Sequence, residues 1–143
     1  MATLLVEIVT PETALWTGEA GALMARSSEG QFTILPEHTA LVGDLVPGVV
    51  RVTTTTGELS FVVHGGFFQV GPGDEGVTRA TVLAGVAERL EEIDVARAQA
   101  AKEAAELTLT SLSDEAEVAR AEAVAALGRA ETRLRARTSA ASK

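Results

Sequence analysis

The chain has 143 residues, enough for one ordinary domain or for one small domain with an appendage. Its 12 Lys and Arg against 20 Asp and Glu give a net charge of −8, which argues against a general nucleic-acid-binding protein because phosphates need clustered cations. The absence of Cys excludes a disulfide framework, a thiolate metal site and a Cys nucleophile. No apolar run approaches the roughly 18 residues of a membrane span. The first residues lack the basic and apolar regions of a signal peptide, so a cytoplasmic soluble protein is expected.

The composition changes sharply near residue 87. Twelve of the 13 Gly, all four Pro and all five aromatic residues lie before this point, whereas the 56 residues after it hold 16 Ala, one Gly and no Pro. Gly and Pro are typical of turns between strands, while Ala, Glu, Arg and Leu favour helices. The sequence therefore predicts two domains of different type, residues 1–87 and residues 88–143.

Short strands separated by turns are predicted for the first domain. The expected strands, rich in β-branched and apolar residues, cover residues 4–9, 21–27, 32–35, 49–55, 59–63, 67–70 and 77–83. Turn signals such as Pro47-Gly48 and Thr56-Gly57 lie between them. Short strands with regular turns favour an antiparallel sandwich or barrel. A parallel sheet is not expected, because no segment between the strands is long enough for a crossover helix.

A hairpin of two helices is predicted for the second domain. The first helix is expected from Glu88, and the second from an N-cap at Ser113 to about Arg137. Apolar residues at three- and four-residue spacing predict the seam between the helices: Leu90, Ile93, Ala100, Ala104 and Leu107, then Val118, Ala121, Val124, Leu127 and Leu134. Because Ala buries little apolar area, the two helices should pack weakly on each other.

Charge divides the second domain again. Residues 88–119 carry nine acidic and three basic residues, whereas residues 120–143 carry two acidic and six basic ones. A solvated charged face and an acidic partner for the last helix both explain this distribution. Arg129, Arg133 and Arg137 share one helical stripe, and opposite Asp94 and Arg97 they form a hypothetical anion-binding seam.

No pattern of residues predicts an active site. The run 71–76 matches G-x-G-x-x-G, but no helix follows to receive a pyrophosphate, so we interpret it as a turn between strands. His38 and His64 are the only histidines, too few for a zinc site without further ligands, and a structural or interface role is expected for each. No metal site and no enzymatic activity are predicted.

Several motifs in order resemble the epsilon subunit of F-type ATP synthases of the bacterial type. They are SEGQFTILPEH at 28–38, LVPG at 45–48, HGGFFQV at 64–70, the strand at 77–84 that ends before Glu88, and I-D-x-x-R from Ile93. The family has Gly in the first motif where this chain has Thr33. The resemblance covers nearly the whole chain and implies a sandwich of about ten strands followed by a two-helix antiparallel hairpin.

The resemblance also implies a role and partners. The chain would be a rotor subunit of the central stalk that links the gamma subunit to the membrane c-ring and couples proton translocation to ATP synthesis. It would lie on the cytoplasmic face of the cell membrane and contact the membrane only through the complex. By similarity, Glu29, Gly30 and Gln31 would face the c-ring, and His38 would lie near the rotor interface.

For the hairpin, the resemblance implies regulation. The family's hairpin restrains ATP hydrolysis when it extends towards the catalytic alpha and beta subunits, here through the basic last helix. No cofactor is required, but some bacterial members bind ATP as a regulatory ligand. The positions that match their site are Glu88, Ile93, Asp94, Arg97, Arg129 and Arg133, while an intervening arginine of those members is Ala104 here.

Two readings from other classes stay open at this point. One is a free-standing β-sandwich that binds a small ligand and carries a regulatory helical appendage, which requires a convergent polar pocket. The other is a free-standing coiled-coil adaptor, which requires larger seam residues than Ala. Recovery with the gamma and c subunits after mild copurification would favour the rotor subunit over both.

Overall fold

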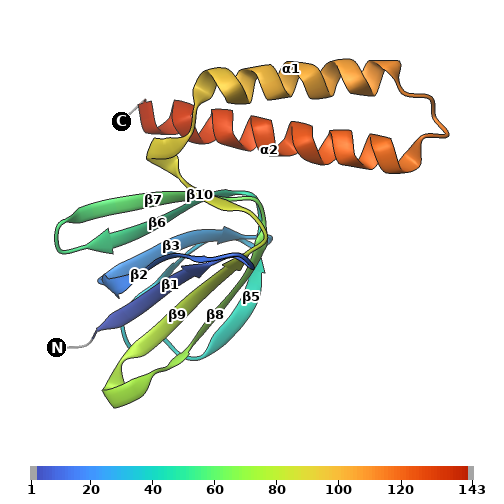
Figure 1. The fold of residues 1–143 in the computed structure, drawn as a ribbon. Coiled ribbons are helices and arrows are strands. Elements are labelled where there is room, and N and C mark those ends of the chain that lie inside the picture. The colour runs from blue at the N-terminus through green and yellow to red at the C-terminus, as the bar shows by residue number, and fades with distance from the viewer. Residues whose placement is uncertain (1–2, 142–143) are drawn as a thin grey trace. The chain divides into compact units, whose positions relative to one another are not determined.

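The computed structural model describes the backbone of residues 3–141 and the side chains of residues 3–138 (Figure 1). Its contacts divide the chain into two compact units, one up to Glu91 and one from Glu92. The sequence predicted the division after Ala87. The observed division lies later in the chain, because Ala87, Glu88 and Arg89 form a last strand that pairs with a strand of the first unit.

Ten strands make up the first unit within the described residues. They are β1 (Leu4–Val9), β2 (Ala14–Ala20), β3 (Ala22–Ser27), β4 (Gly30–Ile34), β5 (Leu41–Leu45), β6 (Gly48–Thr54), β7 (Gly57–Val63), β8 (Gly66–Pro72), β9 (Thr78–Ala84) and β10 (Ala87–Arg89). One sheet has the order β2-β1-β9-β8-β5, and we name it sheet A. The other has the order β10-β7-β6-β3-β4, and we name it sheet B. The predicted sandwich followed by two helices is confirmed.

One strand pair departs from the expected antiparallel arrangement. β1 and β9 are parallel, whereas every other pair of described strands is antiparallel. Two parallel neighbouring strands need a long connection between them, and from the sequence only a helix was considered for that connection. Here the strands from β2 to β8 supply it. Of the run 71–76, Gly71 and Pro72 end β8, and the predicted turn between strands begins at Gly73 and contains a short 3-10 helix (Asp74–Gly76) before β9.

The core of the sandwich consists of large side chains from both sheets. Alternate residues of β1 point inward, and Leu4, Val6 and Ile8 have no exposed surface. Trp16 packs at the edge of this core with its ring centroid 6.3 Å from that of Phe61, which is fully buried. The rings of Phe32 and Phe68 stack across the core at 4.4 Å. Burial of such side chains stabilises a fold by about 1.5–3 kcal/mol each.

The strands that the sequence did not predict all lie at sheet edges. β2 and β5 are the edges of sheet A, and β10 is an edge of sheet B. β2 contains Gly18, where an added Cβ would lie 2.7 Å from the Trp16 ring. β5 contains Gly43, where an added Cβ would lie 2.6 Å from the Phe68 ring. These two glycines, which the close packing requires, interrupt the apolar pattern of β2 and β5, so the pattern does not predict the two strands.

The second unit is a hairpin of α1 (Val95–Ser111) and α2 (Glu117–Ala141), which run side by side in opposite directions (Figure 1). α1 begins later than the predicted Glu88, because β10 and the 3-10 helix η2 (Leu90–Glu92) precede it. α2 begins later than predicted as well. Ser113 does not cap it; the carbonyl of Ser113 instead accepts the N–H of Ala116 in a turn, at 3.1 Å.

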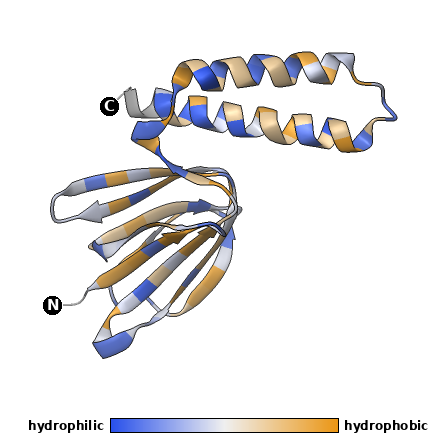
Figure 2. Ribbon diagram, viewed as in Figure 1, coloured by the Kyte–Doolittle hydropathy of each residue, from blue (hydrophilic) through white to orange (hydrophobic). Residues whose placement is uncertain are grey.

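The seam of the hairpin agrees with the prediction only in part: Ile93 is buried, and Leu90, Leu127 and Leu134 are half-buried. Leu107, Val118 and Val124 are 71%, 75% and 55% exposed. The buried residues of the two helices are small instead: Ala98, Ala105, Ala123, Ala130, Thr132 and Ala136. Ala occurs on several faces of both helices, so apolar and polar residues are not segregated and spacing alone does not identify the buried face (Figure 2). Among the described residues, no helix is long and apolar enough to cross a bilayer.

Candidate functional site

The three residues expected to face the c-ring lie at the tip of the hairpin between β3 and β4. Ser27 pairs with Gly30 in the strand register, so the chain turns through Ser28 and Glu29. Gly30 has a φ of 126°, a backbone conformation that glycine adopts most readily. Glu29, Gly30 and Gln31 are all exposed. Glu29 lies in this turn and Gly30 and Gln31 begin β4, so the structure brings the three residues together at the tip of one hairpin.

Polar contacts hold this turn in place. The hydroxyl of Ser27 accepts the N–H of Glu29 at 3.1 Å and donates to the carbonyl of Gly30 at 3.2 Å. From β5, in the other sheet, the carboxylate of Asp44 accepts two hydrogen bonds from Ser28, from its N–H at 3.2 Å and from its hydroxyl at 3.0 Å. Asp44 was not predicted as a site residue from the sequence. The available signal was an acidic residue inside the apolar run of residues 41–45.

His38 does not join the turn. It lies in the loop beyond the opposite end of β4, half-buried, with Nδ1 2.7 Å from the carbonyl oxygen of Thr39. The preceding Glu37 has a φ of 70° and donates its N–H to the hydroxyl of Thr78 on β9 at 2.6 Å. Because β4 separates His38 from Gly30, the predicted ring-facing residues and the predicted rotor-interface residue occupy different ends of a strand.

An apolar row crosses the outer face of sheet A. Leu83 on β9 lies between Val9 on β1 and Phe67 on β8 in the strand register. On β5, Asp44 stands opposite Phe67, and Val42 lies two residues before it on the same face, opposite Gln69. Phe67 is 62% exposed, Leu83 46% and Val42 71%. We name Val9, Leu83, Phe67 and Val42 the outer row. The signal in the sequence was Phe67 beside Phe68, because adjacent strand residues point to opposite faces and only one can enter the core.

A hollow of about 310 Å³ continues the outer row at the ends of β1 and β9. It is lined mainly by apolar groups from Val9, Pro11, Leu83 and Gly85. A second hollow of about 300 Å³ lies beside it, between the β1–β2 turn and Val86. These hollows do not collect several titratable side chains, and residues 3–138 contain no cluster of His, Asp and Glu able to hold a metal.

Most of the predicted ATP-binding residues lie in the second unit. Asp94 is the N-cap of α1: its Oδ1 accepts the backbone N–H of Arg97 at 3.1 Å. The I-D-x-x-R motif thus contains a helix cap, and its Asp and Arg are joined through the backbone of the arginine. Ile93 before them is buried, and the side chain of Arg97 is exposed.

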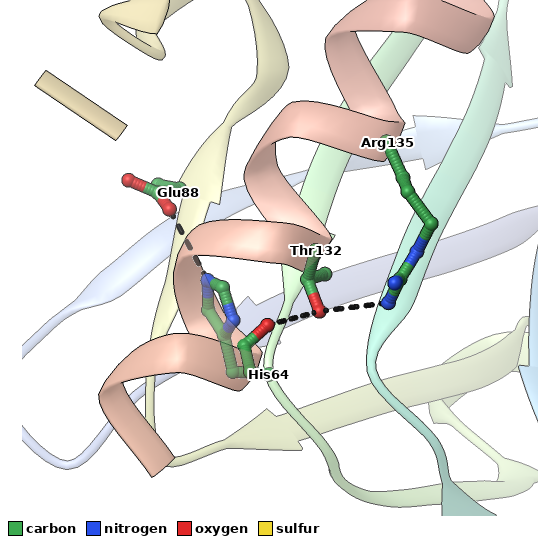
Figure 3. Close-up of polar contacts among 5 residues, drawn as sticks. His64, Glu88, Thr132 and Arg135 are labelled. Carbon is green, nitrogen blue, oxygen red and sulfur yellow. Dashed lines mark hydrogen bonds and ion pairs between the residues drawn. The ribbon is translucent and has the colours of Figure 1, made fainter. Parts of the chain in front are cut away.

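Arg129 and Arg133 lie one helical turn apart on α2, and both are half-buried. They are in the second half of α2, which runs beside the beginning of α1, so both arginines and Asp94 belong to the same end of the hairpin (Figure 1). Glu88, in contrast, is part of β10 in the first unit. Its Oε1 lies 3.2 Å from Nε2 of His64, whose side chain is 5% exposed (Figure 3).

Two other arginines of α2 bind backbone or side-chain oxygens of the hairpin itself. Arg135 donates to the hydroxyl of the buried Thr132 at 3.4 Å, one turn away on the same helix (Figure 3). Arg120 donates to the carbonyls of Leu112 and Ser113, at 3.1 and 3.4 Å, where α1 ends. Arg120 therefore links the two helices at the loop, a role that the sequence analysis did not predict.

Comparison with known proteins identifies the family. The family model for the beta-sandwich domain of the ATP synthase delta/epsilon chain matches residues 3–90, and the model for its long alpha-helix domain matches residues 91–138. The chain belongs to the ATP synthase delta/epsilon chain family. As a member it is a non-catalytic subunit, which agrees with the prediction from the sequence.

Bacterial epsilon chains are among the relatives of this family member. The ATP synthase epsilon chain of Thermobifida fusca is 46% identical over 106 residues, which are 72% of this chain and 74% of the relative. That of Dehalococcoides mccartyi is 41% identical over 135 residues, 94% of this chain and 92% of the relative. These matches confirm the resemblance to bacterial epsilon subunits.

Solved ATP synthases contain chains of the same fold. A chain in the Euglena gracilis mitochondrial ATP synthase, solved as an assembly of OSCP, F1 and c-ring, matches with a TM-score of 0.73 and 26% identity, over 100% of this chain and 83% of that one. A chain in the central stalk and c-ring of the Tetrahymena thermophila enzyme matches with a TM-score of 0.57 and 18% identity, over 96% and 95%. The second likeness concerns the fold alone.

Proposed function

We propose that the chain is a rotor subunit of the central stalk, in which the sandwich joins the gamma subunit to the c-ring and couples proton translocation to ATP synthesis. Family membership supports this role, as does the assembly in which the Euglena relative was solved. The observation that carries the proposal is the outer row: Phe67 and Leu83 are register partners with large exposed apolar side chains, and the exposed Val42 lies diagonal to Phe67 on the same face. Contiguous exposed apolar residues mark interaction sites.

The outer row fits a macromolecular partner better than a small ligand. Small-ligand sites need convergent polar groups within an enclosing cavity. The hollows beside the outer row instead present Pro11, Val9, Leu83 and Gly85 at the end of an open sheet face. A broad apolar face is suited to binding another subunit of the stalk, and we propose that this face binds the gamma subunit. The projecting turn at Glu29–Gln31 is then the contact to the c-ring, so the chain would reach the cytoplasmic face of the membrane only through the complex.

The test replaces two residues of the outer row. Phe67→Ser with Leu83→Ser should weaken binding to purified gamma at least tenfold, because apolar contacts are lost while the core stays intact. Val124→Ser is the matched control, since Val124 is similarly exposed but lies in the hairpin. Circular dichroism checks folding. Unchanged binding of the double variant to gamma would contradict the assignment of this face.

We also propose that the hairpin restrains ATP hydrolysis. Residues 120–143 carry a net charge of +4 and can meet acidic surface on the catalytic subunits. The buried residues of the two helices are mostly Ala, so separating the helices exposes little apolar area. A chain that ends after Glu91 keeps β10 and with it the whole sandwich. It should assemble and support ATP synthesis while raising ATP hydrolysis.

Charge neutralisation refines that test. Replacing Arg129, Arg133 and Arg137 together by Gln should reproduce part of the rise in hydrolysis, and the effect of these charges in the wild type should weaken as salt screens them over about 8 Å. Equal hydrolysis with and without residues 92–143, over a range of salt, would contradict an inhibitory hairpin. ATP as a regulatory ligand of the closed hairpin stays a prediction, which calorimetry of the isolated chain with ATP and magnesium would test.

A further inference from the structure

The turn that projects Glu29, Gly30 and Gln31 has little apolar packing to hold it, because all three residues are exposed. Strand pairing ends at Ser27 and Gly30. The hydrogen bonds of Ser27 within the turn fix its local shape but do not fix its direction relative to the sandwich. Gly30 and Gln31 pair with Ser27 and Arg26, so Ser28 and Glu29 are the residues that lie beyond the last strand pair and that a contact with another element would restrain further.

Asp44 provides that restraint from the opposite sheet. One carboxylate oxygen accepts the N–H of Ser28 and the other accepts its hydroxyl, at 3.2 and 3.0 Å. Two bonds to one residue fix both its position and its orientation, and hydrogen bonds to an ionised acceptor are roughly twice as strong as neutral ones. Nearby, Val46, the residue after β5, donates its N–H to the carbonyl of Arg26 on β3 at 3.1 Å, so a second hydrogen bond joins the chain at the end of β5 to the end of β3.

Asp44 is itself held firmly. It lies on β5, whose residues pair with β8, and it stands opposite Phe67 in that register. The neighbouring Gly43 lies against the Phe68 ring, where an added Cβ would lie 2.6 Å away. Within residues 3–138, the two hydrogen bonds that the Asp44 carboxylate accepts from Ser28 are the side-chain hydrogen bonds that join the turn to sheet A. The position of the turn therefore follows the position of β5.

We propose that Asp44 is a positioning residue that holds the 28–31 turn rigid for its contact with the c-ring. The inference rests on the proposed rotor function. A subunit that transmits rotation between two partners needs a stiff connection, and the path here runs from the outer row through β8 and β5 to Asp44, Ser28 and the turn. Val42 in the outer row and Asp44 belong to the same short strand, so one strand serves both proposed contacts.

The first experiment uses the isolated full-length chain. Asp44→Ala should accelerate amide hydrogen exchange at Ser28 at least tenfold and move its amide proton resonance upfield, while the midpoint of unfolding changes little. Asp44→Asn keeps one acceptor oxygen and should restore part of the protection. Asp74→Ala, which removes another acidic residue from a turn of the sandwich, is the control and should leave Ser28 unchanged. Unchanged exchange at Ser28 in Asp44→Ala would overturn the proposal.

The second experiment uses the assembled ATP synthase. With equal subunit content, Asp44→Ala should lower the number of protons pumped per ATP hydrolysed at least twofold, and Asp44→Asn should recover part of it. If Asp44→Ala does not fold, Ser28→Ala removes the hydroxyl bond and serves instead. A loosened turn with normal coupling would overturn the positioning role and leave the rotor function standing. Failure of the wild-type chain to assemble with gamma and the c-ring would overturn the rotor function itself.

Discussion

The two units of the chain are stabilised in different ways. The sandwich buries Phe61, Leu4 and Ile8 completely, together with other branched side chains from both sheets. In the two helices, the hairpin buries five Ala and one Thr among its described residues. Since burial is worth roughly 25 cal/mol per Å² of apolar surface, packing stabilises the sandwich far more than the hairpin.

Local interactions take a larger share in the hairpin. Ala, Glu and Arg have high helix propensity, Asp94 caps the start of α1, and Arg120 binds the carbonyls at its end. Such interactions stabilise each helix or its ends without requiring extensive contact between the helices. The difference teaches that the sandwich is a fixed body, while the hairpin can separate at low cost. The proposed functions follow this division, with fixed contacts on the sandwich and regulation in the hairpin.

The largest effect is expected in the core of the sandwich. Phe61→Ala should lower the free energy of unfolding by about 3–5 kcal/mol, because it removes a fully buried ring that packs against Trp16. Leu107→Ala in the hairpin, at a residue 71% exposed, should change it by less than about 0.5 kcal/mol. Urea denaturation followed by Trp16 fluorescence measures the loss in the sandwich, and urea denaturation followed by the helical circular dichroism signal measures the loss in the hairpin. Comparable losses in the two variants would break the contrast between the units.

A backbone position in the sandwich should come next. Gly66→Ala should cost about 2–3 kcal/mol, because Gly66 has a φ of 147° and its added Cβ would overlap the carbonyl of Leu83 on β9. Gly85→Ala is the matched control, since nothing lies within 4 Å of its Cβ position. Thermal unfolding of both variants checks the difference. A neutral Gly66→Ala would show that β8 and β9 can separate locally.

The same contrast explains what could be predicted from the sequence. Strands with large inward residues, such as β1 and β9, showed a clear apolar pattern and were predicted within a residue or two of their observed ends. The edge strands β2 and β5 were missed because glycines interrupt their apolar pattern: Gly18 makes room for the ring of Trp16 on its own strand, and Gly43 makes room for the ring of Phe68 on β8, a tertiary cause that no local pattern contains. The parallel pairing of β1 with β9 was also missed, because it depends on how all the intervening strands fold.

Helix contacts were harder to predict than helix existence. Both helices were expected, yet the predicted seam combined Ile93, which is buried, with Leu107 and Val118, which are exposed. In a helix with Ala on several faces, the few larger residues do not reveal which face is buried. The residues of the proposed contact with the c-ring, Glu29, Gly30 and Gln31, were predicted together because they are consecutive in the chain. Asp44 could not be found in this way, since its partner Ser28 is 16 residues away in the other sheet.

A smaller effect is expected at the N-cap of α1, and it separates two roles for Asp94. Asp94→Ala should destabilise the hairpin by about 1 kcal/mol, because the N–H of Arg97 loses its acceptor. Asp94→Ser should restore most of that stability, since Ser is also a good N-cap. Helicity by circular dichroism and calorimetry with ATP measure the two properties separately. If Asp94→Ser is as stable as wild type and ATP binding is unchanged, Asp94 is a cap and not a nucleotide ligand.

The smallest effect is expected where Arg120 joins the two helices at their loop. Arg120→Ala should destabilise the hairpin by about 0.5 kcal/mol, the scale of a partly exposed cation at a helix C-terminus. Much of this effect should persist at high salt, because the carbonyls of Leu112 and Ser113 carry no net charge, whereas the 3.8 Å contact with the exposed Asp114 is screened. Arg135→Ala is the control, because Arg135 donates within its own helix. Hydrogen exchange should then quicken near residues 112–116 in Arg120→Ala alone, and equal exchange in both variants would show that the loop does not hold the hairpin closed.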